Sequence, residues 1–438
     1  MDPMVLAYDI AYTAAAAATS PLWAYRLFRT GKWRTDWPAR FGQCRLPGGP
    51  GVPGAGVPGA GEATQLTGRT LLIHAVSVGE VGAIRLLVDR LHQEAAGLRI
   101  VISTTTDTGT ARARQLFEPD HAVVRFPFDW TCCVERFLDA VKPDLVGLVE
   151  NEVWPNFMVQ CAKRGVPACV INGRLTERSF RRYHLVRPVA KGMYGRLTAA
   201  AVQTEAYAQR FESLGTPAQG IKVLDTMKWD TAQVADHVDG ADELAVAMGI
   251  DRARPLIVAG STGPGEEQML IEARPPQAQL LIVPRKPERF EQVAKLSADF
   301  VRRSQSPDGT QRPPDRHGLY LLDTMGELRK AYALADVAIV GRSFRHGLGG
   351  SDMIEPCALG KPTITGRHHR NFADTVAALQ AGGGIEVTDQ PGPAAAALLA
   401  DPARASEMAR RARGVIFARQ GATKRHADLL MSLLEESH

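Results

Sequence analysis

Short apolar runs alternate with amphipathic segments along most of the chain. In the first half, each run is rich in Val, Ile, Leu or Ala and has the length of one buried strand. These runs cover residues 70–76, 99–104, 143–150, 168–173 and 198–203. The segments between them have helical spacing, as Val81, Ile84 and Leu87 show within residues 80–95. The alternation predicts a parallel sheet covered by helices on both faces.

The same alternation restarts after residue 250. Its apolar runs cover residues 255–261, 279–285, 319–323, 336–341 and 362–366. Two such blocks predict an α/β protein with two doubly wound, Rossmann-like domains that face a central cleft. We place the first domain at residues 63–222 and the second, with its closing helices, at residues 223–438. Ligands of such sheets bind beyond the carboxyl ends of the strands.

The chain begins with an apolar stretch that is interrupted by Asp9 and Pro21. It lacks the charged start and cleavage pattern of a secretory signal, and it is poorer in Leu and Ile than a typical spanning helix. Aromatic and basic residues follow, as at a membrane interface: Trp23, Tyr25, Arg26, Phe28, Arg29, Lys32, Arg34 and Arg40. We therefore predict that residues 1–45 form a membrane-associated segment, either inserted in the membrane or lying on it, with the body on the cytoplasmic side. An ordinary buried helix is the alternative.

Two further segments stand out by composition. Residues 46–62 are rich in Gly and Pro and repeat the sequence VPGA, which predicts a surface loop without chemistry. A basic cluster follows the middle of the first domain and consists of Arg178, Arg181, Arg182, Arg187 and Lys191. Such a cluster suits an anionic membrane surface or a phosphorylated lipid, and it is equally compatible with a solvated charged face.

Composition narrows the class of function. The chain has 438 residues and a formal net charge of +5, which is too small to predict a nucleic-acid partner. Its six cysteines form no CxxC pair and lack the spacing of a zinc site. HExxH, DxD and P-loop patterns are missing in any convincing setting, so we expect neither a catalytic metal nor a cofactor. A serine hydrolase is unsupported because no GxSxG elbow occurs.

Acidic residues follow two of the predicted strands in the first domain. Glu80 comes after the first strand, at the start of a helix, where a carboxylate can take a proton from an attacking hydroxyl. It can also simply favour the helix N-terminus electrostatically. Glu150 and Glu152 follow the apolar run DLVGLV (144–149), at the tip of a buried strand where unpaired acids are costly. They can hold a basic residue, shape the loop or bind sugar hydroxyls.

Glycine-rich turns and cations follow the strands of the second domain. The turn at residues 260–265 precedes a helix, and its small residues would let backbone N–H groups approach a phosphate. Arg285 and Lys286 end the next strand. A second glycine-rich loop, residues 347–351, precedes a helix that carries Glu355, which can accept hydrogen bonds from ribose hydroxyls or act as a helix-start residue.

Several motifs occur together and in order over roughly residues 20–390. They are HAVSVGE (74–80), TTTDTG (104–109), ENEVWPN (150–156), NGRLTER (172–178), VAGST (258–262) with PGE (264–266), VPRKPERF (283–290), DTMGEL (323–328) and EPCALG (355–360). Each motif alone is weak, and together they are specific. The chain resembles the bacterial 3-deoxy-D-manno-octulosonic acid (Kdo) transferases.

The resemblance implies a GT-B fold and an inverting, metal-independent transfer of Kdo from CMP-Kdo to a lipid A precursor, lipid IVA, in lipopolysaccharide biosynthesis. It places the protein at the cytoplasmic leaflet of the inner membrane, anchored N-terminally or peripheral. Glu80 would be the general base and Glu150 a second essential acid. The first domain would bind the acceptor through Ser77, Gly79, Thr105, Glu152, Arg174 and Arg178. The second would bind the donor through Ser261, Thr262, Arg285, Gly326, Glu327, Gly349, Gly350, Ser351 and Glu355.

The chain departs from the family pattern mainly in the donor half. It has Ser351-Asp352 where many members have His-Asn, and Gly263 and Arg367 where members have His and Pro. Asp225-Thr226 stands where members have Gly-Asn. Two alternatives therefore stay open, namely a related GT-B enzyme that uses another nucleotide sugar, and a non-catalytic lipid-binding relative.

Overall fold

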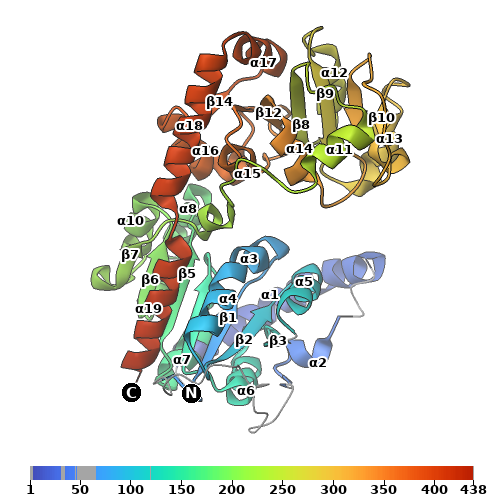
Figure 1. The fold of residues 1–438 in the computed structure, drawn as a ribbon. Coiled ribbons are helices and arrows are strands. Elements are labelled where there is room, and N and C mark those ends of the chain that lie inside the picture. The colour runs from blue at the N-terminus through green and yellow to red at the C-terminus, as the bar shows by residue number, and fades with distance from the viewer. Residues whose placement is uncertain (1–2, 31–34, 45, 47–65, 119, 438) are drawn as a thin grey trace. The chain divides into compact units, whose positions relative to one another are not determined.

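The computed structural model describes residues 3–30, 35–44, 46, 66–118 and 120–437. The chain forms two compact units (Figure 1). The first comprises Met1–Thr231 with Gly421–His438, and the second comprises Ala232–Gln420. Lys32, Arg34 and nearly all of the predicted loop at 46–62 lie outside the described residues.

Seven parallel strands form the sheet of the first unit in the order β3-β2-β1-β4-β5-β6-β7. The strands are β1 (Thr70–His74), β2 (Arg99–Thr104), β3 (Ala122–Arg125), β4 (Leu145–Val149), β5 (Ala168–Gly173), β6 (Ala199–Val202) and β7 (Ile221–Val223). The helices are α1 (Pro3–Thr30), α2 (Trp37–Arg40), α3 (Val78–Ala83), α4 (Arg85–Glu94), α5 (Asp107–Phe117), α6 (Thr131–Val141), α7 (Pro155–Lys163), α8 (Glu177–Leu185), α9 (Arg187–Tyr194), α10 (Glu205–Ser213) and α19 (Ala422–Glu436). The helix predicted at 80–95 is divided into α3 and α4, because Ile84 ends α3.

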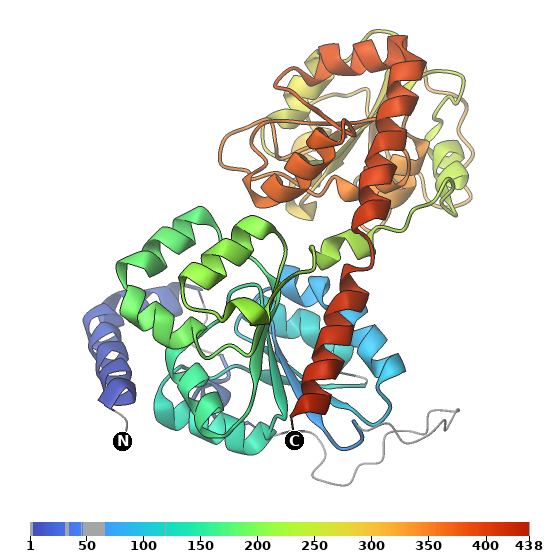
Figure 2. The same cartoon turned by 90° about the vertical axis from the view of Figure 1, so that its left-hand side faces the viewer.

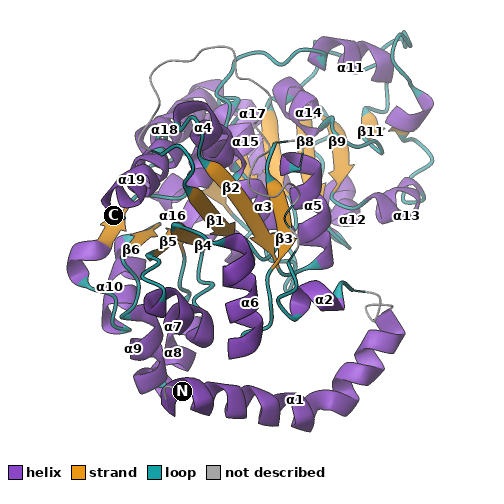
Figure 3. Cartoon of the chain, turned by 90° about the horizontal axis from the view of Figure 1, so that it is seen from below, coloured by secondary structure: helices purple, strands orange, loops and turns teal. Residues whose placement is uncertain are grey.

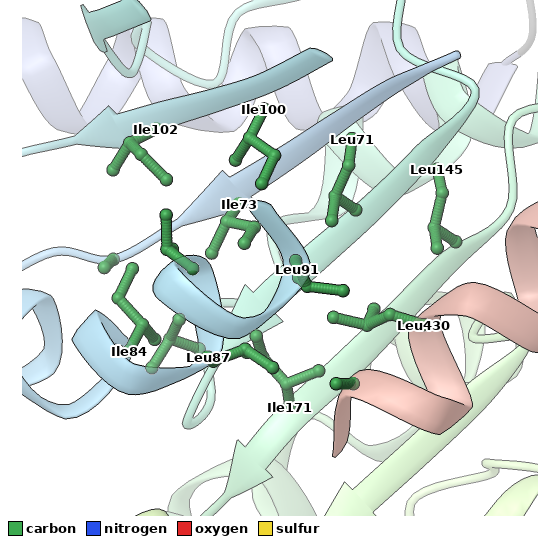
Figure 4. Close-up of a cluster of buried hydrophobic side chains, with 14 of the residues drawn as sticks. Leu71, Ile73, Ile84, Leu87, Leu91, Ile100, Ile102, Leu145, Ile171 and Leu430 are labelled. Atoms are coloured by element: carbon green, nitrogen blue, oxygen red, sulfur yellow. The ribbon is translucent and has the colours of Figure 1, made fainter. Parts of the chain in front are cut away.

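Both faces of this sheet are buried, as the apolar runs predict. Leu71 and Leu72 pack into two different cores, because successive residues of a strand point to opposite faces. Figure 4 shows one of these cores, with Leu71 and Leu145 of the sheet near Leu91 of α4.

The C-terminal helix α19 covers part of the same face, and its Leu430 belongs to this core (Figures 2 and 4). The division of the chain thus differs from the one expected at residue 222. The first unit continues to Thr231, and the last 18 residues, 421–438, belong to it and not to the second unit. The physical reason is the apolar face of α19, where Leu429, Leu430 and Leu434 are buried.

The N-terminal helix α1 is held to the body by polar contacts. The Asp9 carboxylate accepts hydrogen bonds from Asn156 Nδ2 (2.9 Å) and Thr131 N (3.0 Å), and the Tyr12 hydroxyl donates to Asp129 Oδ2 (2.9 Å). These contacts join α1 to the N-terminal ends of α6 and α7 (Figure 3). Among the described residues, every helix is too short or too polar to cross a membrane.

The second unit repeats the architecture in the order β10-β11-β9-β8-β12-β13-β14, again with parallel strands. The strands are β8 (Leu256–Thr262), β9 (Gln279–Pro284), β10 (Val301–Arg302), β11 (Leu319–Leu321), β12 (Val337–Val340), β13 (Thr363–Thr365) and β14 (Glu386–Val387). The helices are α11 (Ala241–Met248), α12 (Glu266–Glu272), α13 (Phe290–Ala294), α14 (Leu328–Leu334), α15 (Ile354–Ala358), α16 (Ala373–Ala381), α17 (Pro391–Ala400) and α18 (Pro402–Arg419). Its core also forms two clusters.

Each sheet has one point where the direction of winding reverses. In the first unit the chain winds outward from β1 through β2 and β3, and then from β4 through β5 to β7. In the second unit the reversal falls between β8 and β12, which are hydrogen-bonded neighbours. Ligands of open α/β sheets bind beside such switch points, at the carboxyl ends of the strands. A site is therefore expected in each unit by itself, at the loops after β1 and β4 in the first unit and at the loops after β8 and β12 in the second.

Candidate active site

Glu80 lies at the switch point of the first unit, in the first turn of α3. Ser77 caps this helix, since its Oγ accepts a hydrogen bond from Glu80 N (3.4 Å). The Glu80 carboxylate in turn accepts hydrogen bonds from Ser77 Oγ (2.7 Å) and Val76 N (2.9 Å). This reciprocal arrangement resembles a capping box. The helix-start role considered from the sequence is therefore present, and it fixes the position of the carboxylate.

The surroundings of Glu80 make its carboxylate a better base. Burial raises the pKa of this group most, and the charge of Glu150 raises it further, whereas the hydrogen bonds from Ser77 and Val76 lower it. The net pKa lies above the ordinary value for glutamate. A carboxylate binds about four hydrogen-bond donors, so the two intramolecular bonds leave room for a substrate hydroxyl. A raised pKa strengthens a general base.

Glu150 follows β4 on the other side of the same switch point. Its φ of +59° is a left-handed conformation that residues other than glycine rarely adopt. Hydrogen bonds to β5 and the loop after it hold this conformation, from Glu150 N to Ile171 O (3.0 Å) and from Arg174 N to Glu150 O (3.3 Å). Strained backbone of this kind is concentrated at functional sites.

Glu152 completes a group of three neighbouring carboxylates. Trp154 Nε1 donates a hydrogen bond to its Oε2 (3.0 Å). Burial raises the pKa of Glu152 to about 7, with further contributions from the charges of Glu80 and Glu150. A cluster of acids with raised pKa values weakens the fold, so it is retained mainly where function requires it. Such clusters are therefore typical of active sites.

Replacing Glu152 should therefore stabilise the protein at alkaline pH. The pKa of Glu152 is higher in the folded state than in the unfolded state, so ionisation of this group destabilises the fold. The stabilising contribution of its neutral form is fully present below pH ~4.3 and is lost as the pH rises through about 7. Glu152→Gln removes the penalty, and we expect it to increase the free energy of unfolding by roughly 1–2 kcal/mol at pH 8, after allowance for solvent screening. The gain should vanish near pH 4, and urea unfolding at both pH values measures it. An equal gain at both pH values would contradict the raised pKa of Glu152 as the cause of the stabilisation.

The loop after β2 is fastened to the loop after β1. Thr106 Oγ1 donates to Val76 O (2.8 Å), and a Cβ at Gly109 would lie 2.8 Å from the same oxygen, so only glycine fits there. Thr105 O accepts hydrogen bonds from Arg40 Nη2 (2.6 Å) and Arg125 Nη1 (3.1 Å). One arginine of the basic N-terminal segment thus binds the backbone beside the site.

The remaining predicted acceptor residues lie around this group. Ser77 contacts Glu80 directly, and Gly79 is exposed in the first turn of α3. Arg174 follows β5 and is joined to Glu150 through the backbone. Arg178 is exposed in the first turn of α8, the helix that follows β5. Their binding of an acceptor remains a prediction.

In the second unit, the loop after β8 is built on a buried ion pair. Ser261 has a φ of +55°, and Thr262 Oγ1 donates to Glu267 Oε1 (2.9 Å). Arg289 donates hydrogen bonds to both carboxylate oxygens of Glu267, from Nη1 to Oε1 (2.5 Å) and from Nη2 to Oε2 (2.9 Å). Arg285 N donates to Thr262 O (3.1 Å), while the Arg285 side chain is exposed.

Glu266 joins the loops after β8 and β12, and it was not among the predicted site residues. Its side chain is completely buried and accepts hydrogen bonds from Gly263 N (2.8 Å), Arg342 N (2.6 Å) and Phe344 N (2.9 Å). An acid just after a glycine-rich turn at the start of a helix is the sequence signal for such a residue.

The glycine-rich loop after β12 approaches the loop after β8. Gly349 and Gly350 have φ values of +82° and +86°, and a Cβ at Gly350 would lie 2.9 Å from His369 Cα. Ser351 Oγ donates to Ser261 O (3.5 Å). The structure thus brings together the predicted donor residues Ser261, Thr262 and Gly349–Ser351.

Glu355, Gly326 and Glu327 lie on neighbouring elements of this unit. Burial raises the pKa of Glu355, Arg329 at 3.9 Å lowers it, and Asp352 raises it, with a net increase. Glu327 forms an ion pair with Arg303 (2.9 Å) and accepts a hydrogen bond from Thr324 Oγ1 (2.5 Å). Gly326 is exposed with a φ of +89°. Contact of these residues with a donor remains a prediction.

Comparison with solved structures gives the fold. UDP-GlcNAc 2-epimerase from Neisseria meningitidis matches with a TM-score of 0.56 and 14% identity, over 83% of this chain and 100% of that one. MurG from Acinetobacter baumannii matches with a TM-score of 0.51 and 16% identity, over 83% of this chain and 99% of that one. With two doubly wound units, the protein has the GT-B fold of nucleotide-sugar glycosyltransferases, as predicted.

Sequence comparison then gives the family. The sequence model described as 3-deoxy-D-manno-octulosonic-acid transferase (kdotransferase) matches residues 35–231. A 3-deoxy-D-manno-octulosonic acid transferase from Bordetella pertussis is 33% identical over 96% of this chain and 98% of its own length. One from Haemophilus influenzae is 32% identical over 84% and 88%. The chain belongs to the Kdo transferase family and is a glycosyltransferase, which confirms the resemblance found in its motifs.

Proposed function

We propose that this Kdo transferase moves Kdo from CMP-Kdo to a lipid A precursor, lipid IVA, by an inverting reaction that needs no metal. The observation that carries this proposal is the Glu80 carboxylate, held by Ser77 and Val76 at the switch point of the first unit with a raised pKa. A fixed carboxylate of this kind is suited to deprotonate a sugar hydroxyl.

The reaction is a single displacement. Glu80 takes the proton of the acceptor hydroxyl as its oxygen forms a bond to the anomeric carbon of Kdo. The bond between that carbon and the phosphate oxygen breaks, and CMP leaves with the electron pair. CMP departs as an anion without protonation, so charge stabilisation can replace acid catalysis and a metal. One displacement inverts the anomeric configuration.

The second unit offers groups suited to the donor. The backbone N–H of Gly265, in the loop after β8, and the exposed Arg285 can stabilise the phosphate charge. Glu355, half-buried beside Arg329, can accept hydrogen bonds from ribose hydroxyls. In the first unit, Arg174, Arg178 and Thr105 are the groups proposed for the phosphorylated acceptor.

We also propose that the protein works at the cytoplasmic face of the inner membrane as a peripheral enzyme. α1 exposes Leu6 and Ile10, and the C-terminal end of α8 exposes Leu185 (85%) among arginines. Apolar side chains with flanking cations suit an anionic leaflet.

The test is incubation of the purified enzyme with CMP-Kdo and lipid IVA, with and without EDTA, followed by mass spectrometry. We expect the acceptor to gain the mass of Kdo, with release of CMP and equal rates in both samples. Absence of product would contradict the proposed substrates. Product that disappears with EDTA would contradict the metal-independent mechanism.

The altered donor-loop residues Ser351 and Asp352 motivate the alternative of another nucleotide sugar. A thermal-shift comparison of CMP, UDP and GDP distinguishes CMP-Kdo from another nucleotide sugar as the donor. Stabilisation by CMP supports the proposal, and stabilisation by UDP alone supports the alternative.

A further inference from the structure

We propose that Arg342 binds the phosphate of the nucleotide donor and provides a cation that offsets the charge of Asp352 in the glycine-rich loop after β12. The inference rests on the proposed function, since it deepens the description of the donor site. Three features of Arg342 carry it, namely its backbone conformation, the position of its side chain and the charge of the loop around it.

Arg342 has a φ of +60° and lies two residues after β12, at the switch point of the second unit. This left-handed conformation suits glycine and is unfavourable for arginine. A long side chain at such a position weakens the fold, and residues of this kind are concentrated where function needs them. Packing alone therefore does not explain an arginine at this position.

Two hydrogen bonds hold the strained backbone between the glycine-rich loops. Arg342 N donates to Glu266 Oε2 (2.6 Å), and this oxygen also accepts from Gly263 N (2.8 Å) in the loop after β8. Arg342 O accepts from Gly350 N (2.7 Å) in the loop after β12. Arg342 thus connects the two loops directly.

The side chain runs along the same loops. Its Cγ lies 3.3 Å from where a Cβ at Gly263 would be, so the absence of a side chain at 263 leaves room for it. Its Nη2 donates to Leu348 O (2.7 Å), which places the guanidinium beside Gly349 and Gly350. A guanidinium carries five N–H donors, and the bond to Leu348 uses one. Its planar fork matches the oxygens of a phosphate.

The loop after β12 also carries a negative charge that a cation must offset if an anionic donor is to bind. Ser351 is uncharged, and Asp352 follows with a carboxylate whose Oδ1 accepts a hydrogen bond from Ile354 N (2.9 Å). A negative charge beside a phosphate site opposes binding of an anionic donor. An arginine anchored in the same loop offsets it.

Arg342→Gly is the informative variant because glycine adopts the left-handed conformation without strain. We expect it to leave the unfolding temperature unchanged or raised. Inhibition of Kdo transfer by CMP should weaken about 10-fold or more, the effect of losing a hydrogen bond between charged groups. The inhibition constant of cytidine, which has no phosphate, should stay within about twofold of the wild-type value.

Arg345→Ala is the matched control, since Arg345 is an exposed arginine of the same loop. It should leave the inhibition constants of both CMP and cytidine within about twofold of the wild-type values.

Equal CMP inhibition of the wild type and Arg342→Gly would overturn the inference. A parallel loss for CMP and cytidine would also overturn it, because it would mean that Arg342 only shapes the loop. Should Arg342→Gly unfold, Arg342→Lys keeps the charge without the fork, and the same CMP-to-cytidine comparison decides. Lack of CMP inhibition in the wild type would instead contradict CMP-Kdo as donor, and the inference would fall with it.

Discussion

Glu80→Gln should reduce the rate of Kdo transfer by about 10²- to 10⁴-fold in a protein that stays folded. Glutamine has the same shape and keeps one oxygen that can accept the hydrogen bonds of Ser77 or Val76. It cannot take a proton from the acceptor hydroxyl. The loss should fall on kcat, because Glu80 belongs to the first unit and the proposed donor groups lie in the second.

The matched control separates the base from the helix cap. Ser77→Ala removes the capping hydroxyl and leaves the carboxylate, so we expect a stability loss of about 0.5–2 kcal/mol and a much smaller loss of rate. Because the Ser77 bond lowers the pKa of Glu80, its removal should raise that pKa. The rate falls as the pH drops through this pKa, so the acid limb of the pH–rate profile should move to higher pH. If Glu80→Gln transferred Kdo at the normal rate, another residue would be the base.

Much of the fold could be predicted because apolar runs and strand order follow local rules. Residues 99–104 and 168–173 are strands as predicted, since continuous apolar runs fit strands that are buried on both faces. The same logic placed Glu80 and Glu150 at strand ends, and the topology then brings those ends together at one switch point.

The parts that escaped prediction depend on contacts between distant residues. Glu266 and Arg342 are 76 positions apart, and no local pattern pairs them. Asp9 interrupts an apolar stretch in the sequence, and the fold uses it to bind Asn156 and Thr131. The return of α19 to the first unit rests on Leu430 meeting a sheet formed far earlier in the chain. A terminal amphipathic helix gives no indication of which sheet it covers.

Arg289→Met should lower the free energy of unfolding by about 3–5 kcal/mol, the largest stability effect that we expect. Arg289 binds both oxygens of Glu267, whose side chain is only 1% exposed. Removing the arginine leaves a buried carboxylate without its counter-charge, which costs far more than the loss of an exposed pair. Arg181→Met is the control, because the pair of Arg181 and Glu177 is 78% and 52% exposed and should contribute at most about 1 kcal/mol. Urea unfolding followed by circular dichroism measures both.

The double variant Glu267→Gln/Arg289→Met tests the cause of that loss. If the penalty comes from the uncompensated charge of Glu267, neutralising it should restore most of the stability, with a coupling energy of at least about 3 kcal/mol between the two sites. If the arginine stabilises mainly by packing its stem, the double variant would be as unstable as Arg289→Met. The introduced glutamine can still accept the hydrogen bond from Thr262, which in the wild type goes to Glu267 Oε1 (2.9 Å). Recovery of stability should therefore be accompanied by recovery of the loop after β8, and hydrogen exchange of residues 256–290 measures that directly.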